Sequence, residues 1–556
     1  MLSENSVNKI LDAIKGKRAA VFCGAGISYD SGLPIVSELL DYIFSKICLT
    51  PYQSKKIMEN KLPFESIMEM VLRESGLDDI QQIFTAGKPN INHILLAKLA
   101  KQGFLNIIYT TNFDLLIEKA LEDEGLTPDI DFKVYSSTMD FEEIQWDDSI
   151  IKIVKIHGTA SKKEEMAITM SLIASAKYTK ERRQLLEKIF CAEECDEVII
   201  LGYSCSDIDL TQLIESFRGQ KSTILLVEHQ GAKCDIRSEA ISANTVKNIF
   251  RHYSGTRLHI DTAELVKFIW KSLLDEEFIY IPNPGISWKA NINRWYDKSE
   301  EESGTGVKHH IASRLLYAVA EFREAIIHNQ ESIKIALQSN NLLAYASEIG
   351  NMGMAQSAIG ENENAKLSLR ESLPLCKRMG IFANIIPQLQ TYGNILHRTG
   401  DDLNALKFHQ EALQYAETNN DEECISNVLG DMCNSYNRLG MFDYALIAIT
   451  TALRLAKKLG NKQAESSQLG IMAVTYLCTG NYDDSLKHCL DGLEMKKMLG
   501  DRQGECSLLI NLIIIYKYLG KKNEALQVAS ECLALAKSIG NNQAEQLVVA
   551  NIMDIT

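Results

Sequence analysis

The sequence predicts two domains of different fold class: an α/β domain built on a parallel sheet, and an all-helical superhelix of repeats. Up to about residue 280, short apolar runs alternate with helical patterns, as strands and helices do in a doubly wound sheet. From residue 307 the strand-like runs stop, and landmark residues recur every 40 positions. The chain of 556 residues is also longer than one hydrophobic core usually supports. We predict an α/β domain at 1–285, a linker at 286–306 and repeats at 307–556.

Five segments of the first domain are short, rich in Ile, Val or Leu, and largely apolar on both faces, as buried parallel strands are. These segments are Ala19–Cys23, Leu105–Tyr109, Ile150–Ile156, Glu197–Leu201 and Thr223–Val227. Helical stretches separate them, and a helical insert is expected between Pro34 and Thr110. Because ligands of such folds bind at the carboxyl ends of the strands, the residues that follow each strand are the candidates for a functional site.

The second domain is marked by small and apolar residues at fixed phase. Its main glycine series is Gly360, Gly400, Gly440, Gly480 and Gly520. A second series lies midway and comprises Gly380, Gly460, Gly500 and Gly540. A glycine just past a helix adopts the left-handed conformation that ends it, so this spacing predicts two helices per repeat, about six repeats and a closing helix at 541–556.

The pattern resembles the tetratricopeptide repeat in a lengthened form of about 40 residues. Stacked helix pairs of that kind form a superhelix with a concave surface that usually binds peptides or proteins. We therefore expect a protein or peptide trigger as a partner of the repeats. The alternative is that the array only oligomerises or braces the first domain.

Composition excludes several classes of protein. The formal net charge is −15, so binding to nucleic acid is not expected. No apolar run approaches the roughly 18–20 residues of a membrane span. The 13 cysteines are scattered and include no Cys-x2-Cys pair, which disfavours a zinc module and indicates a reducing, cytoplasmic location.

Glycines and polar residues follow the predicted strands. After the first strand come Gly24, Ala25, Gly26, Ser28 and Asp30, and such a turn can bring backbone N–H groups close to a diphosphate. The clusters after later strands contain Thr111, Asn112, Asp114, His157, Gly202, Ser204 and Glu228. Alone, Gly-x-Gly is weak evidence, because tight turns need glycine for backbone reasons. The full dinucleotide fingerprint fails, since Tyr29 stands where the third glycine belongs, which disfavours an ordinary nicotinamide dehydrogenase.

In this order, the motifs resemble those of the sirtuin-like family over about residues 8–280. The matching stretches are Gly24-Ala25-Gly26-Ile27-Ser28, Ser31-Gly32-Leu33-Pro34, Thr111-Asn112-Phe113-Asp114, His157-Gly158 and Gly202-Tyr203-Ser204. The resemblance implies a Rossmann-like fold that binds NAD and cleaves the bond between nicotinamide and ribose. It makes Asn112 and His157 the expected catalytic residues, with His157 as the base that contacts a ribose hydroxyl.

The resemblance also implies the residues that hold NAD. They are Gly24, Ala25, Gly26, Ser28, Asp30, Thr111, Asp114, Gly202, Ser204 and Glu228. Structural roles compete with these assignments: His157 could be a core histidine, and Ser204 could cap a helix. For Glu228 the sequence does not decide between contact with a ribose of NAD and a structural role. His93 is expected to be structural.

Departures from the family pattern point away from protein deacylation. The four-cysteine zinc module is missing, so no zinc is expected, and Ile35-Val36-Ser37 replace the family's Asp-Phe-Arg. Water becomes the expected acceptor, which predicts hydrolysis of NAD to nicotinamide and ADP-ribose. Sirtuin-like domains joined to repeats resemble bacterial anti-phage effectors, so we expect a sensor-gated, homo-oligomeric effector that depletes NAD. The alternatives are a deacylase or ADP-ribosyltransferase whose substrate the repeats recruit, and a non-catalytic adaptor for NAD or ADP-ribose.

Overall fold

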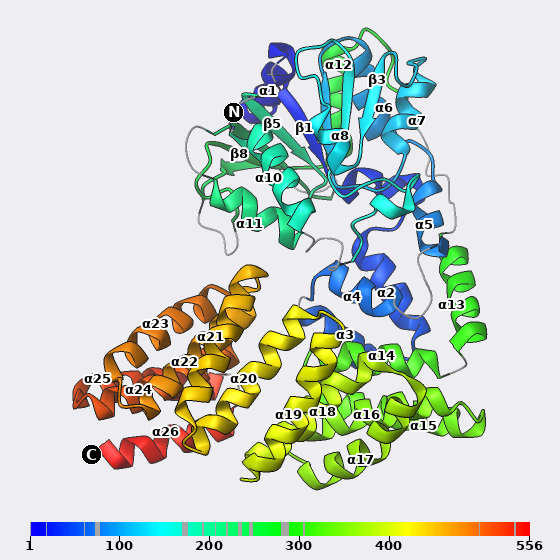
Figure 1. The fold of residues 1–556 in the computed structure, drawn as a ribbon. Coiled ribbons are helices and arrows are strands. Elements are labelled where there is room, and N and C mark those ends of the chain that lie inside the picture. The colour runs from blue at the N-terminus through cyan, green and yellow to red at the C-terminus, as the bar shows by residue number, and fades with distance from the viewer. Residues whose placement is uncertain are drawn as a thin grey trace. The chain divides into compact units, whose positions relative to one another are not determined.

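The computed structural model divides into two compact units, Met1–Ala320 and Glu321–Thr556. It describes residues 2–17, 19–60, 62–72, 78–169, 176–191, 194–205, 207–217, 221–231, 236–243, 248–279, 288–303, 306–499, 501–538 and 541–555. The first unit holds the sheet and the second is a series of helices (Figure 1). The predicted fold class is confirmed in both.

The sheet of the first unit has eight strands in the order β3-β4-β2-β1-β5-β6-β8-β7. All neighbouring strands are parallel except β7 and β8, which pair antiparallel at one edge. The strand bounds are β1 Ala19–Cys23, β2 Ile107–Thr110, β3 Phe132–Tyr135, β4 Ile151–Lys155, β5 Glu197–Leu201, β6 Thr223–His229, β7 Arg237–Ala240 and β8 Gly255–Ile260. The five predicted strands are present, whereas β3, β7 and β8 were not predicted, because their sequences mix polar with apolar residues.

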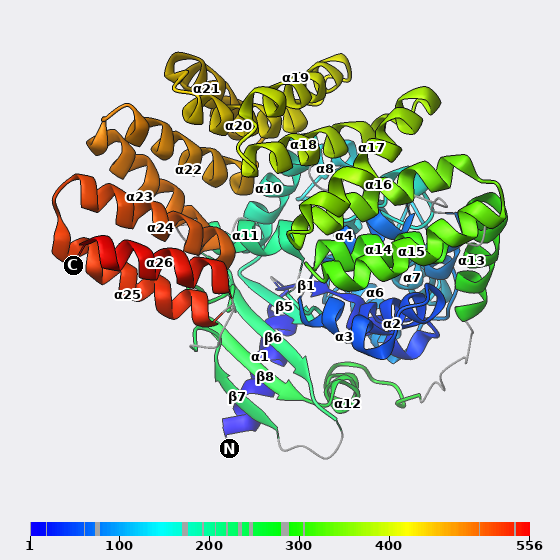
Figure 2. The same ribbon diagram turned by 90° about the horizontal axis from the view of Figure 1, so that it is seen from below.

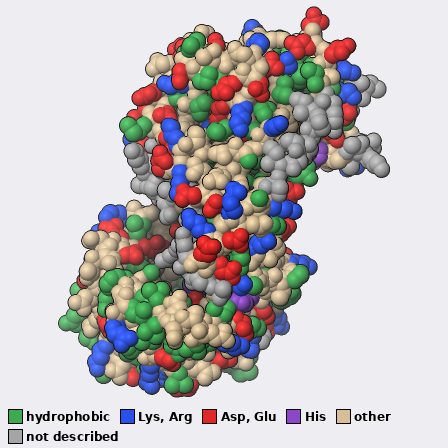
Figure 3. All heavy atoms as spheres, turned by 90° about the vertical axis from the view of Figure 1, so that its right-hand side faces the viewer, with side chains coloured by type: hydrophobic (Ala, Val, Ile, Leu, Met, Phe, Trp, Pro, Cys, Tyr) green, Lys and Arg blue, Asp and Glu red, His purple; other side chains and the backbone are tan. Residues whose placement is uncertain are grey.

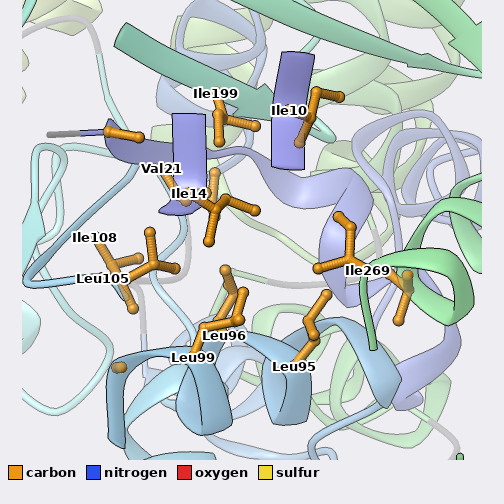
Figure 4. Close-up of a cluster of buried hydrophobic side chains, with 14 of the residues drawn as sticks. Ile10, Ile14, Val21, Leu95, Leu96, Leu99, Leu105, Ile108, Ile199 and Ile269 are labelled. Carbon is orange, nitrogen blue, oxygen red and sulfur yellow. The ribbon is translucent and has the colours of Figure 1, made fainter. Parts of the chain in front are cut away.

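Alternate residues of β1 serve two different cores, as the two-residue period of a strand requires. Val21 and Cys23 face a core built with four helices, and Phe22 faces a second core on the other side of the sheet. The helices of the first layer are α1 Leu2–Gly16, α6 Ile91–Lys101, α7 Leu116–Asp123 and α12 Thr262–Leu273. Figure 4 shows Leu95 and Leu96 of α6 in this first core.

The second layer covers the opposite face of the sheet. Its helices are α8 Thr138–Glu142, α10 Ala176–Phe190 and α11 Ile208–Ser216. Phe22 and Phe190 meet there, with their ring centroids 5.8 Å apart. The unit is therefore a doubly wound sheet with helices on both faces.

The predicted helical insert is present between β1 and β2. It comprises α2 Val36–Lys46, α3 Pro51–Glu59, α4 Phe64–Leu72 and α5 Asp78–Thr85, ahead of α6. The segment predicted to be a linker is largely a helix, α13 Lys289–Ser303, which packs against α2 and α5. Because Ile292 and Trp295 of α13 are buried, this helix is part of the first unit. The next helix, α14 Val307–Ala318, packs against α3 and α4.

The second unit has helices that start every 20 residues. They are α15 Phe322–Gln338, α16 Leu342–Ala358, α17 Asn362–Met379, α18 Phe382–Arg398, α19 Asp402–Thr418, α20 Glu422–Arg438, α21 Phe442–Lys458, α22 Lys462–Cys478, α23 Tyr482–Leu499, α24 Arg502–Tyr518, α25 Lys522–Ser538 and α26 Asn542–Ile555. Seven of the predicted glycines have the expected positive φ, for example 84° at Gly360 and 72° at Gly440. Gly500 and Gly540 lie outside the described residues.

The helices of the repeats form two layers, which Figure 2 shows as a curved stack. Each even-numbered helix from α16 to α24 contacts the next even-numbered helix as well as its sequence neighbours. The even-numbered helices therefore make up one continuous layer, as the first helices of stacked repeat pairs do. The surface of the molecule carries interspersed acidic and basic side chains on the face shown in Figure 3.

Candidate active site

Two loops cross tightly at the carboxyl ends of β1 and β5. The N–H of Gly24 donates to Leu201 O at 3.0 Å, and the N–H of Gly26 donates to Gly202 O at 2.9 Å. A Cβ on Gly24 would lie 2.6 Å from Gly202 O, and one on Gly202 would lie 2.5 Å from Ile27 N. These glycines are thus required for the loops to approach one another. Both amides already donate to carbonyl oxygens. A diphosphate at the predicted site would therefore have to be bound by neighbouring groups.

A buried hydrogen-bond network lies next to this crossing. Ser28 Oγ donates to Asp114 Oδ2 at 2.9 Å and accepts from Asn112 Nδ2 at 3.3 Å. All three side chains are less than 9% exposed. Asp114 Oδ1 in turn accepts from the backbone N–H of Leu116 at 3.1 Å, at the start of α7. Ser28, Asn112 and Asp114, which the sequence predicts to be site residues, are therefore brought together.

The amide oxygen of Asn112 is the exception in this network. Asn112 is 7% exposed, and its Oδ1 is buried and has no hydrogen-bond partner among the described residues. Leaving a buried acceptor unpaired costs roughly 1–3 kcal/mol. Its Nδ2 is held by Ser28, so the orientation of the amide is fixed. Such an oxygen is suited to accept a hydrogen bond from a hydroxyl or a water.

His93 belongs to the same network, although the sequence only suggested a structural role for it. It is fully buried, with Nε2 3.2 Å from Ser28 Oγ. The backbone N–H of Asn90 lies 3.2 Å from Nδ1 and Asn90 Oδ1 lies 2.9 Å from the same nitrogen, so these two contacts favour opposite tautomers of the ring. Ser28 Oγ donates to Asp114, and it accepts from His93 in the tautomer that carries the proton on Nε2. Burial lowers the pKa of His93 to about 4, so the ring stays neutral at pH 7.

His157 follows β4, the strand next to β2. Thr110 of β2 pairs in register with Lys155 of β4, so the loops that carry Asn112 and His157 leave the sheet side by side. His157 is buried, and its ring centroid lies 6.5 Å from that of Phe113. The predicted catalytic residues therefore come from adjacent strands at the same edge.

A buried ion pair lies beneath these two loops. Lys155 Nζ contacts Glu118 Oε1 of α7 at 2.6 Å and also donates to the backbone O of Asp114. Both side chains are nearly inaccessible to water. An unpaired charge in such a buried position would be costly. The pair therefore fixes the loop of Asn112 and Asp114 to β4. The sequence did not indicate this role of Lys155, because the residue stands in a largely apolar strand with no pattern that points to Glu118 or Asp114.

Other predicted NAD-binding residues lie at the rim of the site or away from its centre. Ala25 and Asp30 are exposed beside the loop crossing, Thr111 is half-buried, and Ser204 is exposed after β5. Glu228 of β6 faces β8, where its Oε2 lies 3.1 Å from His259 Nδ1. That pairing gives Glu228 a structural partner, and its role toward adenosine stays a prediction.

A cavity of about 360 Å³ lies beside these loops, between α7, the end of β3 and the loop after β4. Its lining residues are Leu115, Glu118, Lys119, Glu122, Val134, Ser136, Thr159, Ser161 and Lys162. Asn112 and His157 are not among them. Within the described ranges, no cluster of three or more histidine, cysteine or acidic side chains is arranged to hold a metal ion. Likewise, none of the helices in the described part of the chain is long and apolar enough to cross a membrane.

Comparison with known proteins finds a resemblance within the first unit. Residues 106–245 match the model of the SIR2-like domain. Two curated relatives are both named NAD(+) hydrolase ThsA: one from Cytobacillus dafuensis is 27% identical over 38% of this chain and 40% of the relative, and one from Acinetobacter baumannii (strain 532279) is 25% identical over 38% and 42%.

A third curated relative, named NAD-dependent protein deacetylase, comes from Clostridium perfringens (strain 13 / Type A). It is 30% identical over 21% of this chain and 46% of the relative. The chain thus spans 40–46% of the length of these curated relatives.

Among solved structures, NprR in complex with its cognate peptide NprX has a TM-score of 0.37, with 16% identity over 48% of this chain and 77% of that chain. A Rap protein complexed with Competence and Sporulation Factor has a TM-score of 0.36, with 12% identity over 53% and 92%.

Proposed function

We propose that the SIR2-like domain hydrolyses NAD+ at the bond between nicotinamide and ribose. The observation that carries this proposal is the unpartnered, buried Oδ1 of Asn112, in a network whose other groups are satisfied. The names of the two ThsA relatives support NAD+ as the substrate. The order of the strands supports it too, since β4, β2, β1 and β5 are neighbours and present His157, Asn112, Gly26 and Gly202 along one edge.

The reaction consumes water and releases nicotinamide, ADP-ribose and one proton. Nicotinamide leaves as a neutral pyridine, so the site needs to stabilise positive charge on the ribose and to place a water, rather than to protonate a leaving group. Asn112 Oδ1 accepts a hydrogen bond from that water or from a ribose hydroxyl. His157 accepts the proton, as an imidazole does near neutral pH. The Asp114 carboxylate and neutral His93 keep the amide of Asn112 in place through Ser28.

Two other activities remain as alternatives. The deacetylase relative favours transfer to an acyl-lysine, and a protein acceptor would make the chain an ADP-ribosyltransferase. Modified protein among the products would select one of these. Tight binding of NAD or ADP-ribose without turnover would select an adaptor instead.

The test is chromatography of NAD+ products formed by the full chain and its variants. We expect Asn112→Ala and His157→Ala each to lower the rate of NAD+ loss by about 10²-fold or more. The matched control is His229→Ala, which changes an exposed histidine at the end of β6. A His157→Ala protein that consumes NAD+ at the wild-type rate would remove His157 from the mechanism.

We further propose that the chain is a cytoplasmic, homo-oligomeric effector of bacterial anti-phage defence, gated by a protein or peptide trigger on the repeats. An ungated NAD+ hydrolase would kill its own cell, which gives a reason to join the enzyme to a sensor. Cells that produce the wild-type chain should lose NAD+ after phage infection, while cells with Asn112→Ala should not. Light scattering of the purified chain measures the oligomer, and equal NAD+ levels in both strains would contradict the effector role.

A further inference from the structure

Helix α5 lies between the loop of His157 and α13, and it has two faces with different partners. Residues three apart on a helix lie on the same side of it. Asp78 and Gln81 form one such pair, and Asp79 and Gln82 form the other. Asp78 makes an ion pair with Lys163, which lies in the loop after β4. On the side of the helix away from these polar pairs, Ile80 and Ile83 are fully buried and anchor the helix.

The first face of α5 holds the catalytic loops. Gln81 Nε2 donates to the backbone O of Ala160 at 2.6 Å, and the N–H of Ala160 donates to Phe113 O at 2.8 Å. Phe84, in the last turn of α5, packs edge-on against Phe113 with ring centroids 5.4 Å apart. The ring of Phe113 faces that of His157. One helix from the insert thus fastens both loops that carry the proposed catalytic residues.

The second face of α5 holds α13. Arg294 Nη2 donates to Gln82 Oε1 at 3.1 Å, and Arg294 Nε lies 3.8 Å from Asp79 Oδ1. On α13, Ile292 and Trp295 are buried, so Arg294 projects from a helix that is itself firmly packed. Figure 1 shows α13 running beside the insert. Along the chain, α13 is followed by α14 and then by the first helix of the repeats.

We propose that α5 positions the loop of His157, and that α13 sets the position of α5 and so controls NAD+ cleavage. This inference rests on the proposed function. Gln81 acts as a positioning residue because it holds the Ala160 carbonyl, three residues after His157, and touches no reacting atom. A shift of α13 would be transmitted to the catalytic loop through one helix, because Gln82 of α5 contacts Arg294 and Gln81 of α5 contacts Ala160. The segment that joins the enzyme to the repeats is therefore also the segment that adjusts its catalytic loop.

The experiment measures kcat and KM for NAD+ in the full chain. Gln81→Ala should lower kcat about tenfold and leave KM within about twofold, because a small misplacement of a catalytic group slows chemistry more than binding. Arg294→Ala should lower kcat less, by about threefold, since α5 keeps its buried isoleucines. The double variant should be no slower than Gln81→Ala, because both changes act on one element. Gln102→Ala, an exposed glutamine after α6, is the matched control.

A second readout does not depend on turnover. Gln81→Ala should speed hydrogen exchange at the amides of Ala160 and Ala167, which donate to Phe113 O and His157 O, and leave the amides of β6 unchanged. Unchanged exchange at both amides would overturn the positioning role. A double variant whose loss equals the product of the single losses would overturn the route through α13. If the wild-type chain cleaves no NAD+ at all, the proposed function fails, and the exchange measurement still decides the role of α5.

Discussion

Replacing Gly202 by alanine tests whether the loop crossing at the sheet edge is as tight as the structure has it. Gly202 has φ +63°, and a Cβ there would lie 2.5 Å from Ile27 N and 2.8 Å from the carbonyl carbon of Gly26. Normal contacts are about 3.5 Å, so one loop must move by about 1 Å. The left-handed backbone costs about 1–2 kcal/mol for alanine, and overpacking adds about 1–3 kcal/mol. Gly125 is the matched control, because it has φ +85° and nothing within 4 Å of its Cβ position.

Tryptophan fluorescence during urea unfolding gives the readout. All four tryptophans lie in the first unit, so the signal reports that unit. Gly202→Ala should be destabilised by about 1–3 kcal/mol more than Gly125→Ala, which bears only the backbone cost. It should also lose NAD+ turnover about 10²-fold, since Ser28 follows the displaced loop. Equal unfolding midpoints and equal turnover for the two variants would refute the reasoning.

Two titratable groups with shifted pKa values, His93 and Asp431, predict opposite responses of stability to pH. The folded pKa of His93 is about 4, below its usual 6.5, so the first unit should lose up to about 3 kcal/mol of stability as pH falls from 6.5 to 4. His93→Gln should abolish that slope in fluorescence-detected unfolding; an unchanged slope would exclude His93 as its source. Burial raises the pKa of half-buried Asp431 in α20 to about 6 from 3.8, so the stability of the repeats should fall as pH rises through this window. Asp431→Asn should stabilise the repeats at pH 7 by about 1–3 kcal/mol and have little effect at pH 4, as measured by helical circular dichroism; equal effects at the two pH values would contradict it.

Local patterns predicted most of the fold. The apolar runs that form β1, β2, β4, β5 and β6 are short and continuous because each strand is buried on both faces. β7 and β8 were not predicted, because they lie at the partly exposed edge of the sheet. Polar residues such as Arg257 and His259 are tolerated there and interrupt the apolar pattern. The segment expected to be a linker is polar over most of its length. It nevertheless forms α13, because two apolar side chains, Ile292 and Trp295, find a place on the insert.

The sequence predicted the part of the site that stands in local motifs, and it missed the contacts between distant segments. Ser28, Asn112 and Asp114 stand in motifs at the ends of strands, and the parallel register brings them together. His93 and Ser28 are 65 residues apart, and no local pattern indicates that they form a hydrogen bond. Gln81 and Ala160 are 79 residues apart, and their contact depends on how the insert folds back onto the catalytic loop.

The sequence by itself determined the two fold classes, the 40-residue period and the order in which chemical groups reach the sheet edge. These follow from periodicity and strand polarity, which are properties of neighbouring residues. Only the tertiary structure decided that the amide oxygen of Asn112 is left unpaired, which histidine contacts Ser28, and which helix holds the catalytic loop. Those outcomes depend on side chains from distant segments competing for the same buried space and the same hydrogen-bond donors.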